Sequence, residues 1–219
     1  MDIFQVFHLS NISIHVLAGS AALILGIVAL ISKKGKRIHV KSGILFLRVM
    51  IIIIFTGLFG VFVFGRNTIL LVVTVLSAYS AFSGYRTLQT KSNEPKLFDI
   101  IVAILAISTV IYFLYYFQKI GFYWPPATTY AIVGGLFVIV AYDLCRYLIP
   151  RTKYGKIWLY EHIYKMIGAF TALVAAFSGT VFPDNKPYSQ VLPSVFGTVL
   201  TICFLAYYIR LDKTIKRTE

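Results

Sequence analysis

Long apolar segments separated by short polar connections repeat along the whole chain. Breaks at charges, prolines and polar clusters leave segments near the length that crosses a bilayer, at about residues 12–32, 42–64, 67–86, 97–118, 127–148, 162–182 and 191–209. Because a backbone in lipid must satisfy its own hydrogen bonds, each segment is predicted to be an α-helix. The pattern predicts an all-α polytopic membrane protein, with one seven-helix transmembrane domain over residues 1–219.

Composition supports the same class of protein. Of the 219 residues, 58% are hydrophobic and 13% are charged, and the mean hydropathy is +0.80. A water-soluble fold of this size could not hide that much apolar surface. The first 15 residues contain Asp2 and no Lys or Arg, so they lack the basic region of a signal peptide. We therefore expect the first apolar segment to be retained.

The formal net charge of +13 is distributed unevenly along the chain. Most of the 21 basic residues lie in the first, third and fifth connections or after the last segment, and Arg146 and Lys165 belong to the fifth group. The other connections hold only Arg66, Lys119 and Lys186. By the positive-inside rule, the N-terminus is predicted outside and the C-terminus inside. The charge is then a topology signal, which favours a lipid bilayer and argues against nucleic acid as the partner.

Small residues at helical spacing predict the faces on which helices pack. Gly19, Ala22 and Gly26 share one face of the first predicted helix. The third predicted helix carries a similar set, Ser77, Ser80 and Gly84. Small side chains let backbones approach closely inside a membrane, so both faces are expected to contact other helices.

Two histidines stand at the predicted inner border, His39 before the second segment and His162 at the start of the sixth. Two imidazoles at one depth could be the axial ligands of a haem b, with Gly43 leaving room for the flat macrocycle. The same pair, with Glu161 or Asp143, could instead hold zinc or another metal. Alternatively, both histidines hydrogen-bond to loop carbonyls or headgroups.

Charged residues also occur inside the predicted spans. Arg48 lies about 13 Å from the inner end of the second segment and Asp143 about 10 Å from that of the fifth. Intramembrane charges are expensive and usually paired, so we predict an Arg48–Asp143 ion pair, either structural or part of an anion site or proton path. Glu161 and Lys165 are four residues apart and can pair with each other, and the helix dipole alone favours an acid at a helix start.

Three stretches resemble a known family. They are "IHVLAGSAALILGIVALISKKGKRIHVKSGILF" (14–46), "AYSAFSGYRTL" (78–88) and "WLYEHIYKMIGAFTALVAAF" (158–177). Together they look like the DUF2306-type family of bacterial membrane proteins, and the resemblance implies a bacterial inner-membrane protein without an assigned activity. The His, basic loop, His hairpin is also weakly similar to b561-type membrane cytochromes, although those need two histidine pairs.

Three classes of function remain open at this point. The first is a redox or haem-binding membrane protein that uses His39 and His162. The second is a transporter or receptor-like protein, with a site for a small molecule from the cytoplasmic side built on Arg48 and Asp143. The third is a metal-dependent membrane enzyme that uses the two histidines with Asp143 or Glu161.

Overall fold

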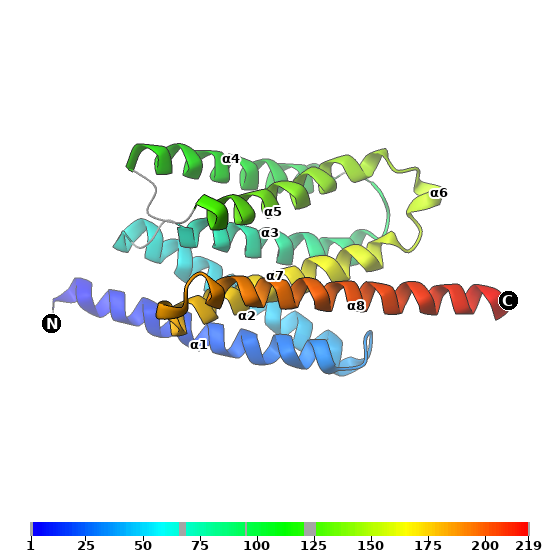
Figure 1. Cartoon of the computed structure of the whole chain (residues 1–219), viewed down its shortest axis with the longest axis horizontal. Coiled ribbons are helices and arrows are strands. Elements are labelled where there is room, and N and C mark those ends of the chain that lie inside the picture. Colours follow the sequence, from blue (N-terminus) through cyan, green and yellow to red (C-terminus); the bar gives the residue numbers. More distant parts are fainter. Residues whose placement is uncertain (1, 66–68, 95, 121–125, 219) are drawn as a thin grey trace. The chain divides into compact units, whose positions relative to one another are not determined.

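The computed structural model describes residues 2–65, 69–94, 96–120 and 126–218. These residues are helical, with no strand among them (Figure 1). The long helices are α1 (Ile3–Ile31), α2 (Arg37–Phe64), α3 (Ile69–Thr90), α4 (Leu97–Ile120), α5 (Pro126–Cys145), α7 (Ile157–Val181) and α8 (Tyr188–Thr218). Short helices follow α5 and α7, at Arg146–Leu148, α6 (Arg151–Tyr154) and Pro183–Asn185. Arg66, which the topology argument uses, lies outside the described residues.

Among the described residues, 6 helices are long and apolar enough to cross a membrane. Their candidate spans are Ile3–Ile31, Arg37–Phe64, Leu97–Tyr116, Thr129–Leu148, Ile157–Val181 and Tyr188–Asp212. Many large apolar side chains on these helices face outward, such as Leu17, which is 71% exposed. Outward-facing apolar surface of this extent suits lipid and not water. The chain is therefore an integral membrane protein.

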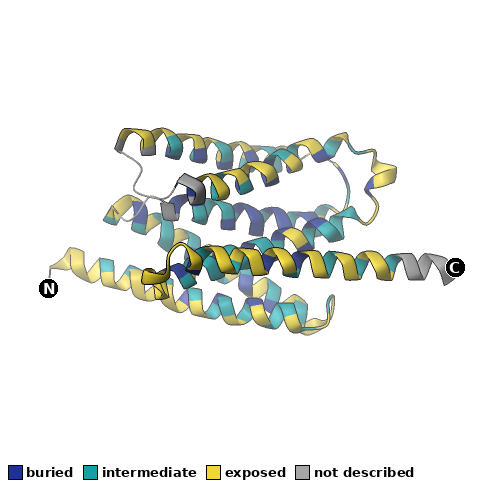
Figure 2. Ribbon diagram, in the orientation of Figure 1, coloured by how far each residue is buried: buried dark blue, intermediate teal, exposed yellow. Residues whose placement is uncertain are grey.

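Helix α3 is the long helix that is absent from that set of spans. Its second half contains serines, a glycine and an arginine, which lower its hydropathy, yet much of it is buried (Figure 2). Ser80 is 1% exposed and Thr87 is fully buried. In membrane proteins small and polar side chains face other helices rather than lipid, so the low hydropathy of α3 is compatible with its burial.

The chain forms two compact units, residues 1–79 with 104–138 and residues 80–103 with 139–219. In the first unit, α1 and α2 pack side by side as a hairpin (Figure 1). The buried stripe on α1 consists of Ala18, Ala22 and Gly26, so the predicted small face is shifted by one residue, with Gly19 only half-buried. In the α3 set, Ser77, Ser80 and Gly84 are all buried, as expected.

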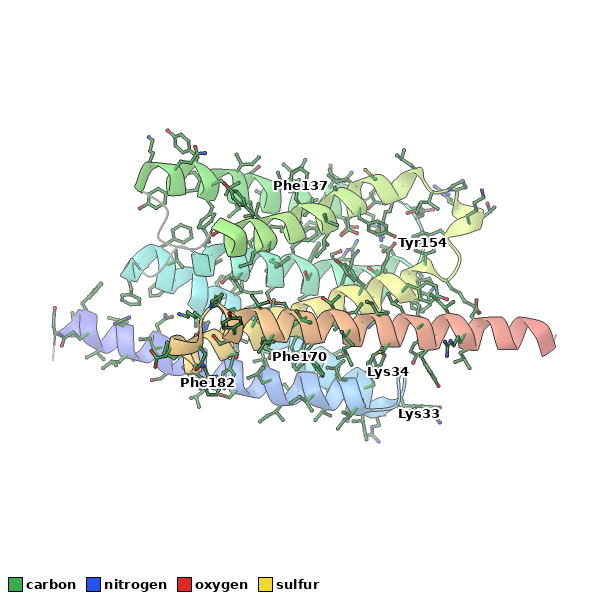
Figure 3. All side chains as sticks on the ribbon, in the orientation of Figure 1. Lys33, Lys34, Phe137, Tyr154, Phe170 and Phe182 are labelled. Atoms are coloured by element: carbon green, nitrogen blue, oxygen red, sulfur yellow. The ribbon has the colours of Figure 1, made fainter. Side chains whose placement is uncertain are left out.

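The basic turn between α1 and α2 contains one lysine with a structural role (Figure 3). The Lys34 ammonium donates hydrogen bonds to the carbonyls of Ala29, at 3.0 Å, and of Leu30 and Ser32. It thus satisfies carbonyl groups that the end of α1 leaves without intrahelical partners. Burial lowers the pKa of Lys34 below its ordinary value.

A separate polar contact joins α1 to α2 within the first unit. Nδ1 of His15 lies 2.8 Å from the hydroxyl of Thr56, which donates to its own helix at Ile52 O. Because that hydroxyl proton is used, His15 donates from Nδ1. Asn11 also donates to the Thr56 carbonyl, at 3.1 Å. The contact accounts for a histidine inside a membrane helix without any ligand.

In the second unit, α7 and α8 are joined by a short turn and pack side by side. A Cβ on Gly179 would lie 2.6 Å from Cγ of Gln190, so a larger residue there would force the Gln190 side chain to shift. At the far end of the helix pair, Lys156 forms an ion pair with Asp212. The Arg86 guanidinium joins α3 to α4 through Asp99, with Nε 2.6 Å from Oδ1.

The observed helix starts correct several predicted boundaries, and α1 begins at Ile3 rather than at residue 12. Helix α7 begins at Ile157 rather than at residue 162, and α2 begins at Arg37 rather than at residue 42. The charged residues read as a membrane border therefore lie inside the helices. For Glu161 this removes the helix-dipole explanation, because the first turn of α7 contains no acidic residue.

Candidate functional site

A buried lysine lies at the centre of the polar interior of the second unit. Lys165, on α7, has a side chain that is 1% exposed. Its Nζ lies 2.5 Å from Oδ1 of Asp143 on α5 and 3.5 Å from Oε2 of Glu161 on α7. The expected Glu161–Lys165 pair is therefore confirmed. An ionised lysine inside a membrane helix bundle is costly unless it is paired, and here two carboxylates surround it.

Glu161 accepts hydrogen bonds from side chains of other segments, which an acid that only interacts with a helix dipole would not need. Its Oε2 lies 2.6 Å from a terminal nitrogen of Arg146, and its Oε1 accepts from the hydroxyl of Tyr142 at 2.7 Å. The same Arg146 nitrogen donates to the hydroxyl of Tyr154 at 3.1 Å. The side chains of Arg146 and Glu161 are 4% and 3% exposed, so this ion pair is removed from solvent.

Helix α3 completes the network through Ser83, whose hydroxyl donates to Oδ2 of Asp143 at 2.5 Å. Both carboxylate oxygens of Asp143 thus have hydrogen-bonded partners. The close approach of α3 and α7 depends on Gly84, because a Cβ there would lie 3.1 Å from Cβ of Lys165 and from Sδ of Met166. A larger residue at this position would push the two helices apart.

The order of charges along the chain explains why they meet. Asp143 and Arg146 are three residues apart, and Glu161 and Lys165 are four apart, so each pair lies on one helical face. Each acid then finds its closest cation on the other segment. We name these residues, together with Ser83, Tyr142 and Tyr154, the charge network.

Two buried polar atoms beside the network lack a hydrogen-bond partner among the described residues. One is Nε of Arg146, and the other is Oδ1 of Asn93. The Asn93 amide donates to the carbonyls of Arg146 and Ile149, at 2.7 and 2.8 Å, and so secures the turn that carries Arg146. A buried donor on the guanidinium leaves one position at which an acceptor would be stabilised.

Tyr154, on the α5–α7 connection, is 2% exposed (Figure 3). Burial raises the pKa of the Tyr154 phenol above its ordinary value, and the negative charge of Glu161 raises that pKa further, against a lowering by Arg146. Its ring centroid lies 5.9 Å from the guanidinium carbon of Arg146, and that of Tyr147 lies 5.1 Å away. Two aromatic rings therefore border the cation.

Each of the proposed haem ligands contacts a backbone carbonyl. Nδ1 of His39 lies 3.0 Å from Ala29 O, and Nδ1 of His162 lies 3.0 Å from Gly84 O. A carbonyl only accepts, so both rings donate from Nδ1. This is the carbonyl contact expected of interfacial histidines, and it is also the contact that orients a ligating imidazole. His39 and His162 belong to different units, and their pairing around a haem, with Gly43, stays a prediction.

Arg48 has an exposed side chain on α2, in the first unit. Asp143, its predicted partner, belongs to the second unit and forms an ion pair with Lys165. The Arg48–Asp143 pair stays a prediction. For the metal alternative, no group of three His, Cys, Asp or Glu side chains that could hold an ion occurs in the described part of the chain. A metal held by His39, His162, Glu161 or Asp143 stays a prediction as well.

Sequence reasoning placed Tyr142, Asp143, Glu161 and Lys165 at a similar depth. It missed the Arg146–Glu161 and Lys165–Asp143 ion pairs because it assigned Arg146 and Lys165 mainly to membrane topology. The two repeated acid-then-base spacings were the available signal. They could not reveal Ser83, which is 60 residues from Asp143, or Tyr154. No family model, curated protein or solved structure matches the chain. Function must therefore be argued from the charge network itself.

Proposed function

We propose that the protein is a proton-coupled membrane carrier whose working site is the charge network. The observation that supports this proposal is Lys165, buried between the carboxylates of Asp143 and Glu161 inside an apolar chain. Buried ion pairs rarely stabilise a fold more than apolar side chains of similar volume would. Stability alone therefore does not account for four buried charges, whereas ionisable groups inside membranes commonly serve ion or substrate pathways.

Protonation changes this network in discrete steps. A proton on Asp143 removes the ion pair with Lys165, whereas a proton on Glu161 removes the charge opposite both Arg146 and Lys165. The affected contacts join α3, α5 and α7, so a change of protonation alters helix packing and not only local charge. An element whose packing depends on one proton is what a coupled carrier requires.

We further propose that α3 crosses the membrane as an interior helix, which gives seven spans with the N-terminus outside. Its 22 residues correspond to about 33 Å, enough for a bilayer core. With this topology, Glu161 and Lys165 lie about 6 and 12 Å from the cytoplasmic start of α7, so a ligand would enter from the cytoplasm. The membrane is the bacterial inner membrane, as the family resemblance implies.

Labelling with a membrane-impermeant maleimide tests the topology. In a variant without Cys145 and Cys203, a cysteine at position 186 should react in intact cells, and one at position 33 only after lysis. Both native residues, Lys186 and Lys33, are exposed in the structure. Labelling of both from the same side would overturn the proposed orientation.

Proteoliposomes that contain a pH-sensitive dye test the carrier. Under a potassium diffusion potential and a pH gradient, panels of carboxylates, amino acids and organic cations are added, and proton entry is followed. At least one solute should change proton entry with wild-type protein, and Lys165→Met should abolish that change. Lys156→Met is the matched control, because its ion pair with Asp212 is on the surface, with 57% of the Lys156 side chain exposed. A wild-type response in Lys165→Met, or no response to any solute, would refute the carrier.

Haem binding is a second proposal, supported by two histidines whose Nδ1 atoms contact backbone carbonyls, because such a contact is the kind that orients a ligating imidazole. Protein purified from haem-replete cells should then show a Soret band that weakens in both His39→Ala and His162→Ala. A colourless preparation would exclude this function and leave the carrier unaffected. Metal analysis of the same sample tests the zinc alternative.

A further inference from the structure

We propose that the charge network binds one small monocarboxylate together with one proton. This inference rests on the proposed carrier function and names its substrate class. Arg146 and Lys165 face Glu161 and Asp143 at 2.6 and 2.5 Å, so two cations balance two carboxylates. The resting network is therefore neutral, and it accepts a further charge only if one of its own charges is neutralised.

Protonation can neutralise the two carboxylates of this network, but the guanidinium of Arg146 keeps its positive charge. A carboxylate can accept a proton, whereas a guanidinium does not release its proton in proteins. A proton on Glu161 would leave Arg146 as a buried cation without its counter-ion. Since an unpaired buried charge is strongly unfavourable, proton uptake should be accompanied by an anion. The proton goes to Glu161, and the ligand carboxylate takes its place against Arg146.

The groups around Glu161 suit a carboxylate ligand because they are hydrogen-bond donors. The donors come from several segments and are Tyr142, Arg146, Tyr154 and Lys165. Asp143 is the other charged group nearby, and its carboxylate accepts from Lys165. Nε of Arg146 is a further donor, buried and without a hydrogen-bond partner among the described residues. A guanidinium presents its donors as a planar fork, which matches a carboxylate with two parallel hydrogen bonds.

Charge and surroundings narrow the class to a monocarboxylate. One proton balances one negative charge, so a dicarboxylate or a phosphate dianion would leave an uncompensated buried charge. The rings of Tyr147 and Tyr154 border the guanidinium of Arg146 and offer apolar surface to a short carbon chain. A small monocarboxylate with an apolar end fits both conditions.

Calorimetric titration of the full-length protein in detergent with sodium butyrate tests this inference. Titrations in buffers of different ionisation enthalpy count the protons that accompany binding, and about one proton should be taken up per butyrate. At pH values above the midpoint at which the site takes up its proton, the apparent dissociation constant for butyrate should rise about tenfold per pH unit, as linkage to one proton requires. Proton-independent binding, or no binding, would overturn the inference.

Variants locate the binding. Arg146→Gln should abolish butyrate binding, and Tyr142→Phe, which keeps the ring and loses one hydroxyl donor, should weaken it several-fold. The Phe variant keeps the test valid if Arg146→Gln does not fold. Lys156→Met is the matched control, since Lys156 forms an ion pair with Asp212 in the same unit but outside the network, and its binding should equal that of wild type. Equal losses in Lys156→Met and Arg146→Gln would overturn the assignment to the network.

Further titrations distinguish failure of the monocarboxylate proposal from failure of the carrier proposal on which it rests. Sodium phosphate and choline chloride are titrated in place of butyrate. If choline or phosphate binds, with loss in Lys165→Met, and butyrate does not, the carrier stands and the monocarboxylate class is wrong. If no solute binds and none changes proton entry into proteoliposomes, the carrier itself fails.

Discussion

The ion pair between Asp143 and Lys165 allows the energetic role of the charge network to be measured directly. Lys165→Met keeps the length and much of the volume of the side chain but removes the charge. Asp143 then keeps the hydroxyl of Ser83, and Glu161 keeps Arg146 and Tyr142. The variant therefore removes the cation that lies 2.5 Å from the buried carboxylate of Asp143.

The contact distances predict unequal effects for the two single variants. Removal of one partner of a buried ion pair destabilises a protein by about 3–5 kcal/mol, and Lys165→Met is expected in that range. Asp143→Asn should have a smaller effect, about 1–3 kcal/mol, since Lys165 still has Glu161 at 3.5 Å and an amide can still contact Ser83. The double variant should be less destabilised than the sum by about 2 kcal/mol, because it leaves no uncompensated charge at this pair.

Reversible unfolding in mixed micelles of increasing dodecyl sulfate content, followed by circular dichroism, provides the free energies of unfolding for this cycle. Lys156→Met serves as the control and should change the free energy by about 0–1 kcal/mol, as expected for an exposed pair. If the effects of Lys165→Met and Asp143→Asn add to within about 0.5 kcal/mol, the two residues do not interact and the reasoning from the 2.5 Å contact is wrong.

Three further predictions concern single contacts. The ultraviolet difference titration between wild type and Tyr154→Phe should show no phenolate until well above about pH 10, because the fold raises the pKa of the Tyr154 phenol. The stability that this protonated phenol contributes is complete below the unfolded pKa of about 10 and is lost as pH rises through the folded pKa. A midpoint of the difference titration near pH 10 would contradict the prediction. Asn93→Ala removes two hydrogen bonds to carbonyls and should destabilise the protein by about 1–3 kcal/mol, measured by the same micelle unfolding; an effect under about 0.5 kcal/mol would mean that the turn holds without it. Thr56→Val removes the acceptor of His15 and should lower the free energy of unfolding by about 0.6 kcal/mol and at most about 1.7, whereas Thr56→Ser should match wild type; equal effects of both would exclude the hydroxyl contact as the cause.

The membrane class and most helices could be predicted from the sequence because hydropathy is a sum over neighbouring residues. Burial of Ala22 and of Ser77, Ser80 and Gly84 followed from spacing alone. The largest boundary errors were the start of α1, at Ile3 instead of residue 12, and the end of α8, at Thr218 instead of residue 209. The start of α7 was placed at residue 162 instead of Ile157 because charge was read as a border. Hydropathy considers only the cost of placing each charged residue in lipid. It does not include an oppositely charged partner that another segment supplies.

The amino-acid sequence by itself determined that this chain lies in a membrane as helices, and that two acid-then-base pairs lie on helical faces. Only the tertiary structure decided that Arg146 and Lys165 are buried and that each forms an ion pair with a carboxylate. It also decided that Lys34 binds the carbonyl groups at the end of α1. The physical reason is that whether a charge is buried depends on its desolvation and on the groups that compensate it. For Lys165 that compensation comes from Asp143, 22 residues earlier, and it forms only when α5 and α7 pack together.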